Sequence, residues 1–134
     1  MGLVKAEAIS LIEQIKDKTS TSRWIFRGQR SSKWRLATSL ERACNSFKLK
    51  ISQNGLALEK VLLREFQRRF HHYQSYVPKD NIELLAYMQH FGAPTRLLDW
   101  TYSLHVAVYF AIEAAPDDPC AVWAIDQKWL QREG

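Results

Sequence analysis

The chain has 134 residues, 46% of them hydrophobic, and its five Trp, five Tyr and six Phe supply large side chains for a core. This length and composition fit one folded domain and exclude an intrinsically disordered protein. Nineteen Lys and Arg against fourteen Asp and Glu give a net charge of +5, which is a mild bias toward anionic partners rather than the dense basic patch of a dedicated nucleic-acid-binding domain.

The two cysteines, Cys44 and Cys120, lie far apart and lack metal-ligand spacing, so neither a disulfide framework nor a metal site is expected. Residues 1–18 carry charges every few positions and lack the apolar core of a signal peptide. No stretch approaches the roughly 20 apolar residues of a membrane span. The sequence therefore predicts a soluble, cytoplasmic protein without membrane contact, and it leaves the oligomeric state open.

The first expected element is an amphipathic helix over residues 5–16, where apolar side chains recur at helical spacing. A short strand over residues 24–27 follows, because Trp, Ile and Phe are strand formers, and Gly28 is expected to end it. Arg27 then lies at the C-terminal end of this strand.

A polar loop around Trp34 comes next, and Ser39 is expected to cap a helix over residues 40–48. A longer helix is predicted to begin at residue 54 or 55 and to end before Pro78, because apolar and basic positions alternate at helical spacing as far as Tyr73. Its outer face carries Arg64, Arg68 and Arg69. These bases form either a solvated helix surface or an anion-binding stripe.

Asp80 and Glu83 resemble a capping box that begins another helix, and Gly92 is expected to close it. Its inward side chains are predicted to be Leu84, Leu85 and Met88, with His90 in the last turn. Because Pro94 forbids continuation of the helix, residues 95–101 are expected to be extended.

This extended segment places Arg96 and Asp99 among apolar residues, and burying a charge without a partner is costly. The segment is therefore either an internal brace or a site.

From Ser103 a helix is predicted, and its small alanines allow close approach to a sheet. Its buried side is expected to carry Val106, Ala107, Phe110, Ala111 and Ala114. Residues 120–125 are expected to form a buried strand, after which Asp126 caps a short helix. The whole pattern predicts an α+β fold in which a small mixed or antiparallel sheet of about three strands is flanked by four to six helices, in a single domain over residues 1–134.

Several separated blocks resemble the FRG domain family, which is named for a Phe-Arg-Gly triplet. The blocks are Phe26-Arg27-Gly28-Gln29, then Trp34, Leu36, Ser39-Leu40 and Arg42, then Gln89-His90, and then Pro94 to Thr101 followed by Ala107 and Tyr109-Phe110-Ala111. The resemblance covers about residues 20–126. It implies a domain of unknown function that occurs in bacterial and phage proteins. Separately, the last expected helix is interrupted by the end of the chain, which favours a C-terminus truncated relative to a longer protein.

A weaker resemblance links Phe26-Arg27-Gly28 and Asp99-Trp100-Thr101 to the ADP-ribosyltransferase superfamily. This likeness implies a divergent module for bacterial or phage conflict that binds a nucleotide, with NAD as the possible cofactor and NAD or ADP-ribose as the ligand. A guanidinium pairs with pyrophosphate through two hydrogen bonds, and a strand-end hydroxyl can bond to a ribose.

The candidate ligand-binding residues in this interpretation are Arg27, Gln29, Trp34, His90, Arg96, Asp99 and Thr101. Arg27 and Gln29 are expected to bind phosphate or ribose, and Thr101 to orient the ligand. Trp34 lies beside cations in a loop, where an aromatic ring can cover a base. His90, Arg96 and Asp99 are expected to line the same cleft.

Transferases of this type use a later acidic residue, which no predicted strand after Ile125 supplies. No catalytic residue is therefore assigned. An enzyme of this kind would be an NAD-dependent ADP-ribosyltransferase or an NAD glycohydrolase, and the sequence does not decide whether it is one.

Each candidate also has a structural interpretation. Arg27 either binds an anion or pairs with Asp99 inside the fold. Arg96 either caps the carbonyls of the helix that ends at Phe91 or clamps a second phosphate. His90 is either a hydrogen-bonded structural residue or a general acid or base. The rival function is a non-enzymatic module that binds protein or nucleic acid through Arg64, Arg68 and Arg69, with an Arg/Asp brace inside.

Overall fold

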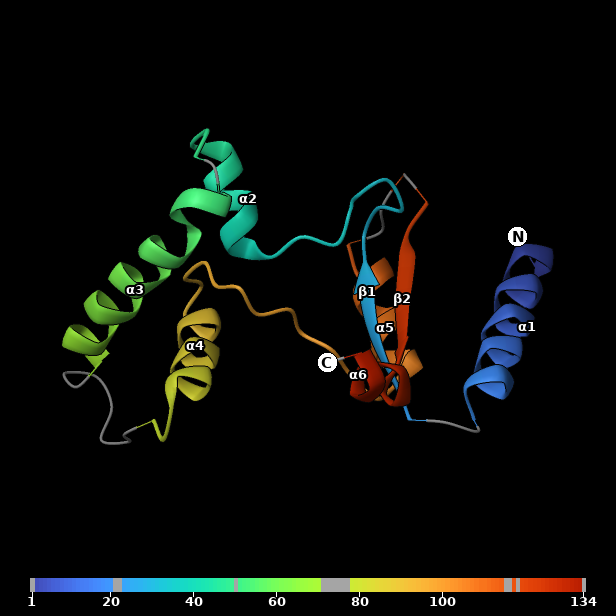
Figure 1. Cartoon of the computed structure of the whole chain (residues 1–134). Coiled ribbons are helices and arrows are strands. Elements are labelled where there is room, and N and C mark those ends of the chain that lie inside the picture. Colours follow the sequence, from blue (N-terminus) through green and yellow to red (C-terminus); the bar gives the residue numbers. More distant parts are fainter. Residues whose placement is uncertain are drawn as a thin grey trace. The chain divides into compact units, whose positions relative to one another are not determined.

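The computed structural model describes residues 2–20, 23–49, 51–70, 78–114, 117 and 119–133. Six helices and two strands lie in these residues, so the predicted α+β class is confirmed. They fall into two compact units (Figure 1). The first unit comprises Met1–Arg35 with Asp99–Gly134, and the second comprises Leu36–Leu98.

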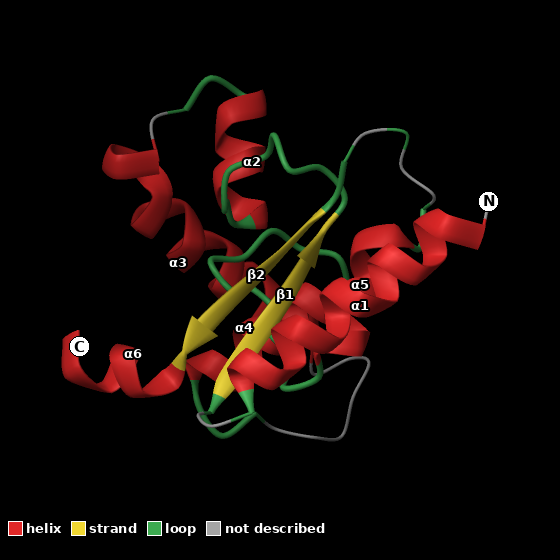
Figure 2. Cartoon of the chain, turned by 90° about the vertical axis from the view of Figure 1, so that its right-hand side faces the viewer, coloured by secondary structure: helices red, strands yellow, loops and turns green. Residues whose placement is uncertain are grey.

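The first unit is built around a two-stranded antiparallel sheet. It contains α1 (Gly2–Thr19), β1 (Trp24–Gln29), α5 (Leu104–Ile112), β2 (Ala121–Asp126) and α6 (Gln127–Glu133). The strands pair along their whole length, from Trp24 opposite Asp126 to Gln29 opposite Ala121 (Figure 2). Asp126 caps α6 by accepting from the backbone N–H of Lys128 at 2.9 Å, as the sequence predicts.

The extended segment 95–101 contributes one bridge instead of a third strand. The N–H of Phe26 donates to the carbonyl of Thr101 at 2.7 Å, and the N–H of Thr101 donates back to Phe26 at 2.8 Å. Pairing stops there because the chain turns into α5 at Ser103, whose hydroxyl caps the helix. The unit therefore has two strands and a bridge where about three strands were expected.

Gly28 lies inside β1, and the prediction that it ends the strand is wrong. A Cβ atom at this position would lie 1.9 Å from the carbonyl oxygen of Ala107 and 2.7 Å from the amide nitrogen of Ala111. The absence of a side chain lets the strand contact the backbone of α5 directly. The predicted close approach of the two alanines to the sheet is therefore confirmed.

The core of the first unit consists of Phe26, Leu104 and Ala107. Partly buried side chains packed against it are Ile12, Ile15, Trp24, Val108 and Val122. Val106, Phe110 and Ala114 are exposed, so their predicted burial is wrong. Val106 and Phe110 each precede by one position an alanine that faces Gly28, and consecutive helical residues point about 100° apart. Ala114 lies beyond the end of α5.

The second unit contains three helices, which are α2 (Ser39–Ser46), α3 (Ile51–Phe70) and α4 (Asn81–His90). The N-cap of α2 is Thr38 rather than the predicted Ser39. Its hydroxyl accepts from the N–H of Glu41 at 3.1 Å, and the carboxylate of Glu41 accepts from the N–H of Thr38 at 2.9 Å. Both residues can cap a helix, and the capping box with Glu41 selects Thr38.

The ends of α4 follow local sequence signals, whereas the start of α3 differs from its prediction. α3 begins at Ile51, a few residues earlier than predicted, and its predicted passage through Tyr73 lies outside the described residues. Asp80 caps α4 by accepting from Glu83 at 2.8 Å, and Gly92 has the positive φ of 81° that a helix-closing glycine adopts. These two predictions are confirmed.

Aromatic and aliphatic side chains fill the space between α3 and α4. Leu84, Leu85 and Met88 are buried, as predicted. The ring of Phe70 lies 5.3 Å from that of Tyr87, in a tilted arrangement that aromatic pairs favour.

Arg96 forms an ion pair with Glu59 of α3. Its Nε and Nη2 atoms each donate to one carboxylate oxygen of Glu59 at 2.6 Å. The predicted cap on the helix ending at Phe91 is wrong, because backbone N–H groups of residues 91–93 already bond to the last carbonyls of α4. The hydrogen bond to Glu59, and then its charge, raise the pKa of Arg96, while burial opposes them.

A methyl group at Gly28 tests the contact between β1 and α5. We expect Gly28→Ala to lower the free energy of unfolding by at least about 2 kcal/mol, because backbone atoms of α5 must shift. Gly92→Ala is the control, since its Cβ meets nothing within 4 Å and only backbone strain of about 1 kcal/mol results. Urea denaturation measures both, and a Gly28→Ala protein as stable as the wild type would contradict the contact.

The ion pair of Arg96 with Glu59 is expected to contribute more than a surface pair. Glu59 has a side chain 8% exposed against 50% for Arg96, so we expect a coupling energy of about 1–3 kcal/mol in a double-mutant cycle with alanine. The matched pair is Arg68 with Glu65, 66% and 43% exposed, which should couple by less than about 0.5 kcal/mol. Equal coupling in the two pairs would refute the structural role of Arg96.

Candidate functional site

The seven residues predicted as a site are divided between the two units. Arg27, Gln29, Trp34, Asp99 and Thr101 belong to the first unit. His90 and Arg96 belong to the second unit. The predicted cleft that joins all seven stays a prediction, and each group is defined here by the contacts inside its own unit.

Arg27 and Asp99 meet in the first unit although 72 positions separate them. The Nη1 atom of Arg27 donates to the backbone carbonyl oxygen of Asp99 at 2.8 Å. The bond fixes the half-buried guanidinium at the place where the chain enters the first unit from Asp99. Because the acceptor is a backbone atom, this contact is independent of the Asp99 side chain.

Gln29 organises two tryptophans through its side-chain amide. Its Nε2 atom donates to the carbonyls of Trp34 at 2.6 Å and of Ser31 at 2.9 Å. Its Oε1 atom accepts from the indole N–H of Trp123 at 3.3 Å. Gln29 therefore positions its neighbours, and its predicted contact with phosphate or ribose stays a prediction.

Trp123 is a residue that the sequence reasoning missed. It pairs with Arg27 in the sheet register, so both side chains leave the sheet on the same side, together with that of Gln29. Side chains alternate along a strand, so the sequence alone indicates on which side of β2 Trp123 lies. The sequence does not show that Arg27 is the residue opposite Trp123. Trp123 is 39% exposed and Trp34 is 58% exposed. We call Arg27, Gln29, Trp34, Asp99 and Trp123 the Arg27 face.

Thr101 uses its backbone to pair with Phe26 and its hydroxyl to begin α5. The Oγ1 atom accepts from the N–H of Ser103 at 3.1 Å. The Thr101 O–H can still donate a hydrogen bond, and a ribose oxygen is a suitable acceptor for it.

The second unit uses its part of the motif mainly as a brace. Thr95 is fully buried and exchanges hydrogen bonds with the hydroxyl of Ser39, which donates to its carbonyl at 3.1 Å and accepts from its N–H at 2.9 Å. Its own hydroxyl donates to Gln89 at 2.5 Å. His90 is exposed in the last turn of α4, with its ring 5.4 Å from that of Phe91.

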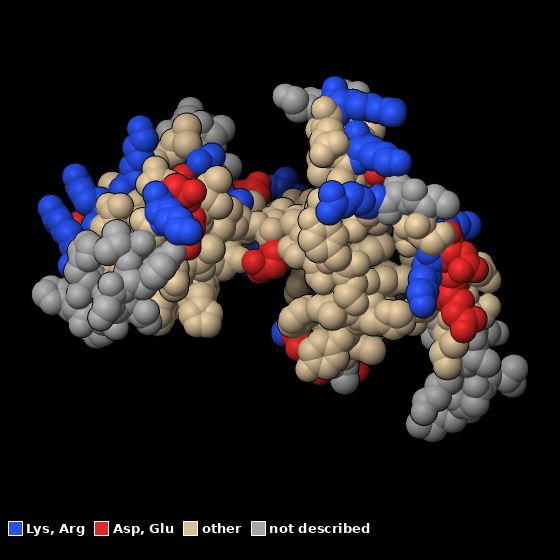
Figure 3. All heavy atoms as spheres, turned by 90° about the horizontal axis from the view of Figure 1, so that it is seen from below, with Lys and Arg blue, Asp and Glu red and all other residues tan. Residues whose placement is uncertain are grey.

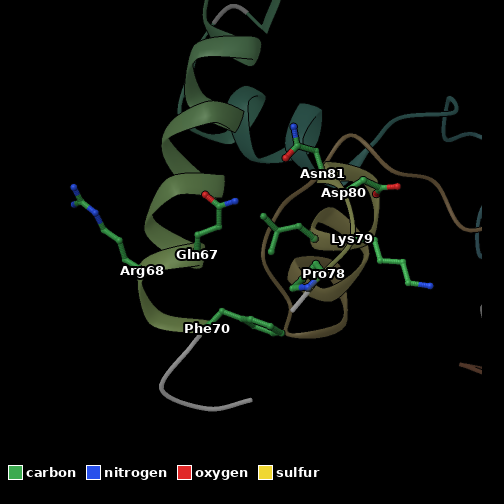
Figure 4. Close-up of a pocket in the computed structure, with 8 residues that line it drawn as sticks. Gln67, Arg68, Phe70, Pro78, Lys79, Asp80 and Asn81 are labelled. Carbon is green, nitrogen blue, oxygen red and sulfur yellow. The ribbon is translucent and has the colours of Figure 1, made fainter. Parts of the chain in front are cut away.

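A pocket of about 450 Å³ lies between the end of α3 and the start of α4. Figure 4 shows that Gln67 points toward α4, whereas the charged groups of Arg68 and Lys79 point away from the pocket. Arg68 also pairs with Glu65 at 3.0 Å. The cations of this pocket's rim are thus not directed at a common anion.

The outer surface of α3 carries several arginines. Arg64, Arg68 and Arg69 are all exposed on this helix. Figure 3 shows Lys and Arg side chains projecting from the left part of the face in view, with acidic atoms between them. This surface is a mixed one rather than a continuous positive field.

Two features are absent from the described residues. These residues include no group of three or more His, Cys, Asp and Glu side chains placed to hold a metal ion. None of the helices in this part of the chain has the length and apolar composition needed to cross a bilayer.

Comparison with known proteins identifies the family. The model of the FRG domain matches residues 22–119, a range that includes the Arg27–Asp99 contact and the Thr95 and Arg96 braces. No curated protein and no solved structure matches the chain. Because the family model covers most of the 134 residues and contains the Phe26-Arg27-Gly28 strand, the chain belongs to the FRG domain family.

Proposed function

We propose that this FRG domain binds an ADP-ribosyl nucleotide, NAD or ADP-ribose, on the Arg27 face of its first unit. The observation that carries the proposal is the placement of a fixed guanidinium beside exposed tryptophans. Arg27 is held by Asp99 at 2.8 Å, and Gln29 bonds both to Trp34 and to Trp123.

The two kinds of side chain suit the two ends of such a ligand. A guanidinium recognises a phosphate through parallel N–H donors, and its fork geometry is preset. An exposed indole stacks on a base, which contributes about 1–3 kcal/mol per base in nucleic-acid-binding proteins. Thr101 pairs with Phe26, so its side chain leaves the sheet on the side opposite to Arg27, and its predicted role in orienting the ligand is not part of this proposal.

The proposal concerns binding and includes no bond-breaking step. Transfer or hydrolysis would need a group that stabilises positive charge on the ribose as nicotinamide leaves. No carboxylate of the described residues is assigned that role.

Trp34→Ala tests the stacking role without removing a structural contact, because Gln29 bonds to the backbone carbonyl of Trp34. We expect the affinity for ADP-ribose to fall by about five- to a hundredfold, as measured by calorimetry. Trp129→Ala is the control, since Trp129 of α6 is also 58% exposed and lies outside the Arg27 face. Equal losses in the two variants would exclude stacking at Trp34.

Arg27→Lys keeps the positive charge and removes the planar fork. We expect at least a tenfold loss of affinity for ADP-ribose, roughly 1.4 kcal/mol, in protein whose circular dichroism shows that it is folded. The control is Arg30→Lys, because Arg30 makes only a surface pair with Glu113 at 3.3 Å. Failure of wild-type protein to bind either ADP-ribose or NAD would remove the proposal.

The alternative function uses α3 instead. Its three exposed arginines, Arg64, Arg68 and Arg69, favour an interaction with phosphates of a nucleic acid or with an acidic protein surface. If α3 binds a short single-stranded oligonucleotide, the affinity must fall steeply between about 50 and 200 mM salt. Replacing the three arginines by glutamine should abolish that binding and leave ADP-ribose binding intact.

A further inference from the structure

A pocket of about 410 Å³ lies in the first unit where α1 ends and where β1 and α5 begin. Its lining residues are Lys16, Thr19, Ser20, Arg23, Trp24, Phe26, Tyr102, Ser103, Leu104 and His105. Small-molecule sites commonly have volumes of about 300–1,000 Å³. We call it the Lys16 pocket.

The charged groups of the Lys16 pocket are all basic. Lys16 and Arg23 contribute these charges, His105 adds an imidazole from a third segment, and no carboxylate is among the described lining residues. None of the described residues forms a hydrogen bond or an ion pair with these three side chains. Unpaired cations around one pocket attract an anion.

Neutral donors add to this charge. The first N–H groups of a helix have no partner within the helix, and they carry the positive end of its dipole. In α5 these are the N–H groups of Leu104 and His105, next to the cap residue Ser103. A phosphate at such a helix end accepts from backbone N–H groups and from nearby cations together.

Trp24 supplies an independent sign of a missing acceptor. Its indole Nε1 atom is buried and has no hydrogen-bond partner among the described residues. Buried polar groups are nearly always paired, so an orphaned donor needs an explanation. Trp24 lines the pocket, so a rotation of its indole would bring this buried donor to an oxygen of a bound ligand.

Three further residues of the wall are aromatic. The Lys16 pocket is also lined by Trp24, Phe26 and Tyr102. Their rings form an apolar surface that inorganic phosphate would leave uncovered. We propose that the Lys16 pocket binds a small phosphate monoester, with its phosphoryl group at Lys16, Arg23 and the start of α5 and its organic part against the aromatic rings.

This site is separate from the Arg27 face. Trp24 and Phe26 alternate along β1 with Arg27, so their side chains leave the strand on the opposite side. Gly28 continues the Trp24 side, where it contacts α5. The two sites therefore use opposite sides of one strand, and either can fail without the other.

Phenyl phosphate, inorganic phosphate and phenol are suitable probes for the full-length protein. Calorimetry gives the affinities, and the ¹H–¹⁵N indole signal of Trp24 reports on the pocket. We expect phenyl phosphate to bind more tightly than either of its parts and to shift the Trp24 signal. The exposed positions Lys16 and Arg23 permit substitution without loss of core packing, and Lys16→Gln and Arg23→Gln should each weaken phenyl phosphate binding by about tenfold.

Lys18→Gln is the matched control, because Lys18 is exposed on the same helix and does not line the pocket. Its affinity should remain within about twofold of the wild type. The proposal is overturned if phenyl phosphate does not bind at about 10 mM, or if Lys18→Gln weakens binding as much as Lys16→Gln does. Equal affinity for inorganic phosphate and phenyl phosphate would overturn the role of the aromatic wall.

Discussion

The close approach of β1 to α5 is the constraint on which the first unit depends. A Cβ at Gly28 would lie 1.9 Å from the carbonyl of Ala107, so only glycine lets the strand lie against this helix. That contact determines which side of β1 is buried. By strand alternation, Arg27 must then leave on the other side, where the antiparallel register brings it beside Trp123. Arg27 of the Phe-Arg-Gly triplet therefore points away from α5 because its neighbour Gly28 faces α5.

The stretch from Met88 to Thr101 serves both units. Thr95 is buried and donates hydrogen bonds to Ser39 and Gln89, and Arg96 pairs with Glu59, so this part braces the second unit. Three residues after Arg96, Asp99 already belongs to the first unit, where its carbonyl holds Arg27. On the second-unit side of Leu98 the polar residues therefore form a brace, whereas on the first-unit side the backbone of Asp99 holds the arginine of the proposed site.

Local features of the fold were predictable from the sequence, whereas the partners in most long-range contacts were not. The Asp80 cap and the Gly92 helix end follow from side-chain and backbone preferences within one turn. The bond between Gln29 and Trp123 joins positions 94 apart, and no periodicity indicates such a partner. Gly28 was misjudged for the same reason, since its role is set by α5 and not by its neighbours in the chain.

Binding of an ADP-ribosyl nucleotide on the Arg27 face is tested most directly by the indole N–H signals of the tryptophans. Each of the five tryptophans gives one signal in a ¹H–¹⁵N spectrum, assigned by substitution with phenylalanine. On titration with ADP-ribose, the signals of Trp34 and Trp123 should move together and saturate at one ligand per chain, while that of Trp129 stays in place. Unchanged Trp34 and Trp123 signals at saturating ADP-ribose would contradict the account.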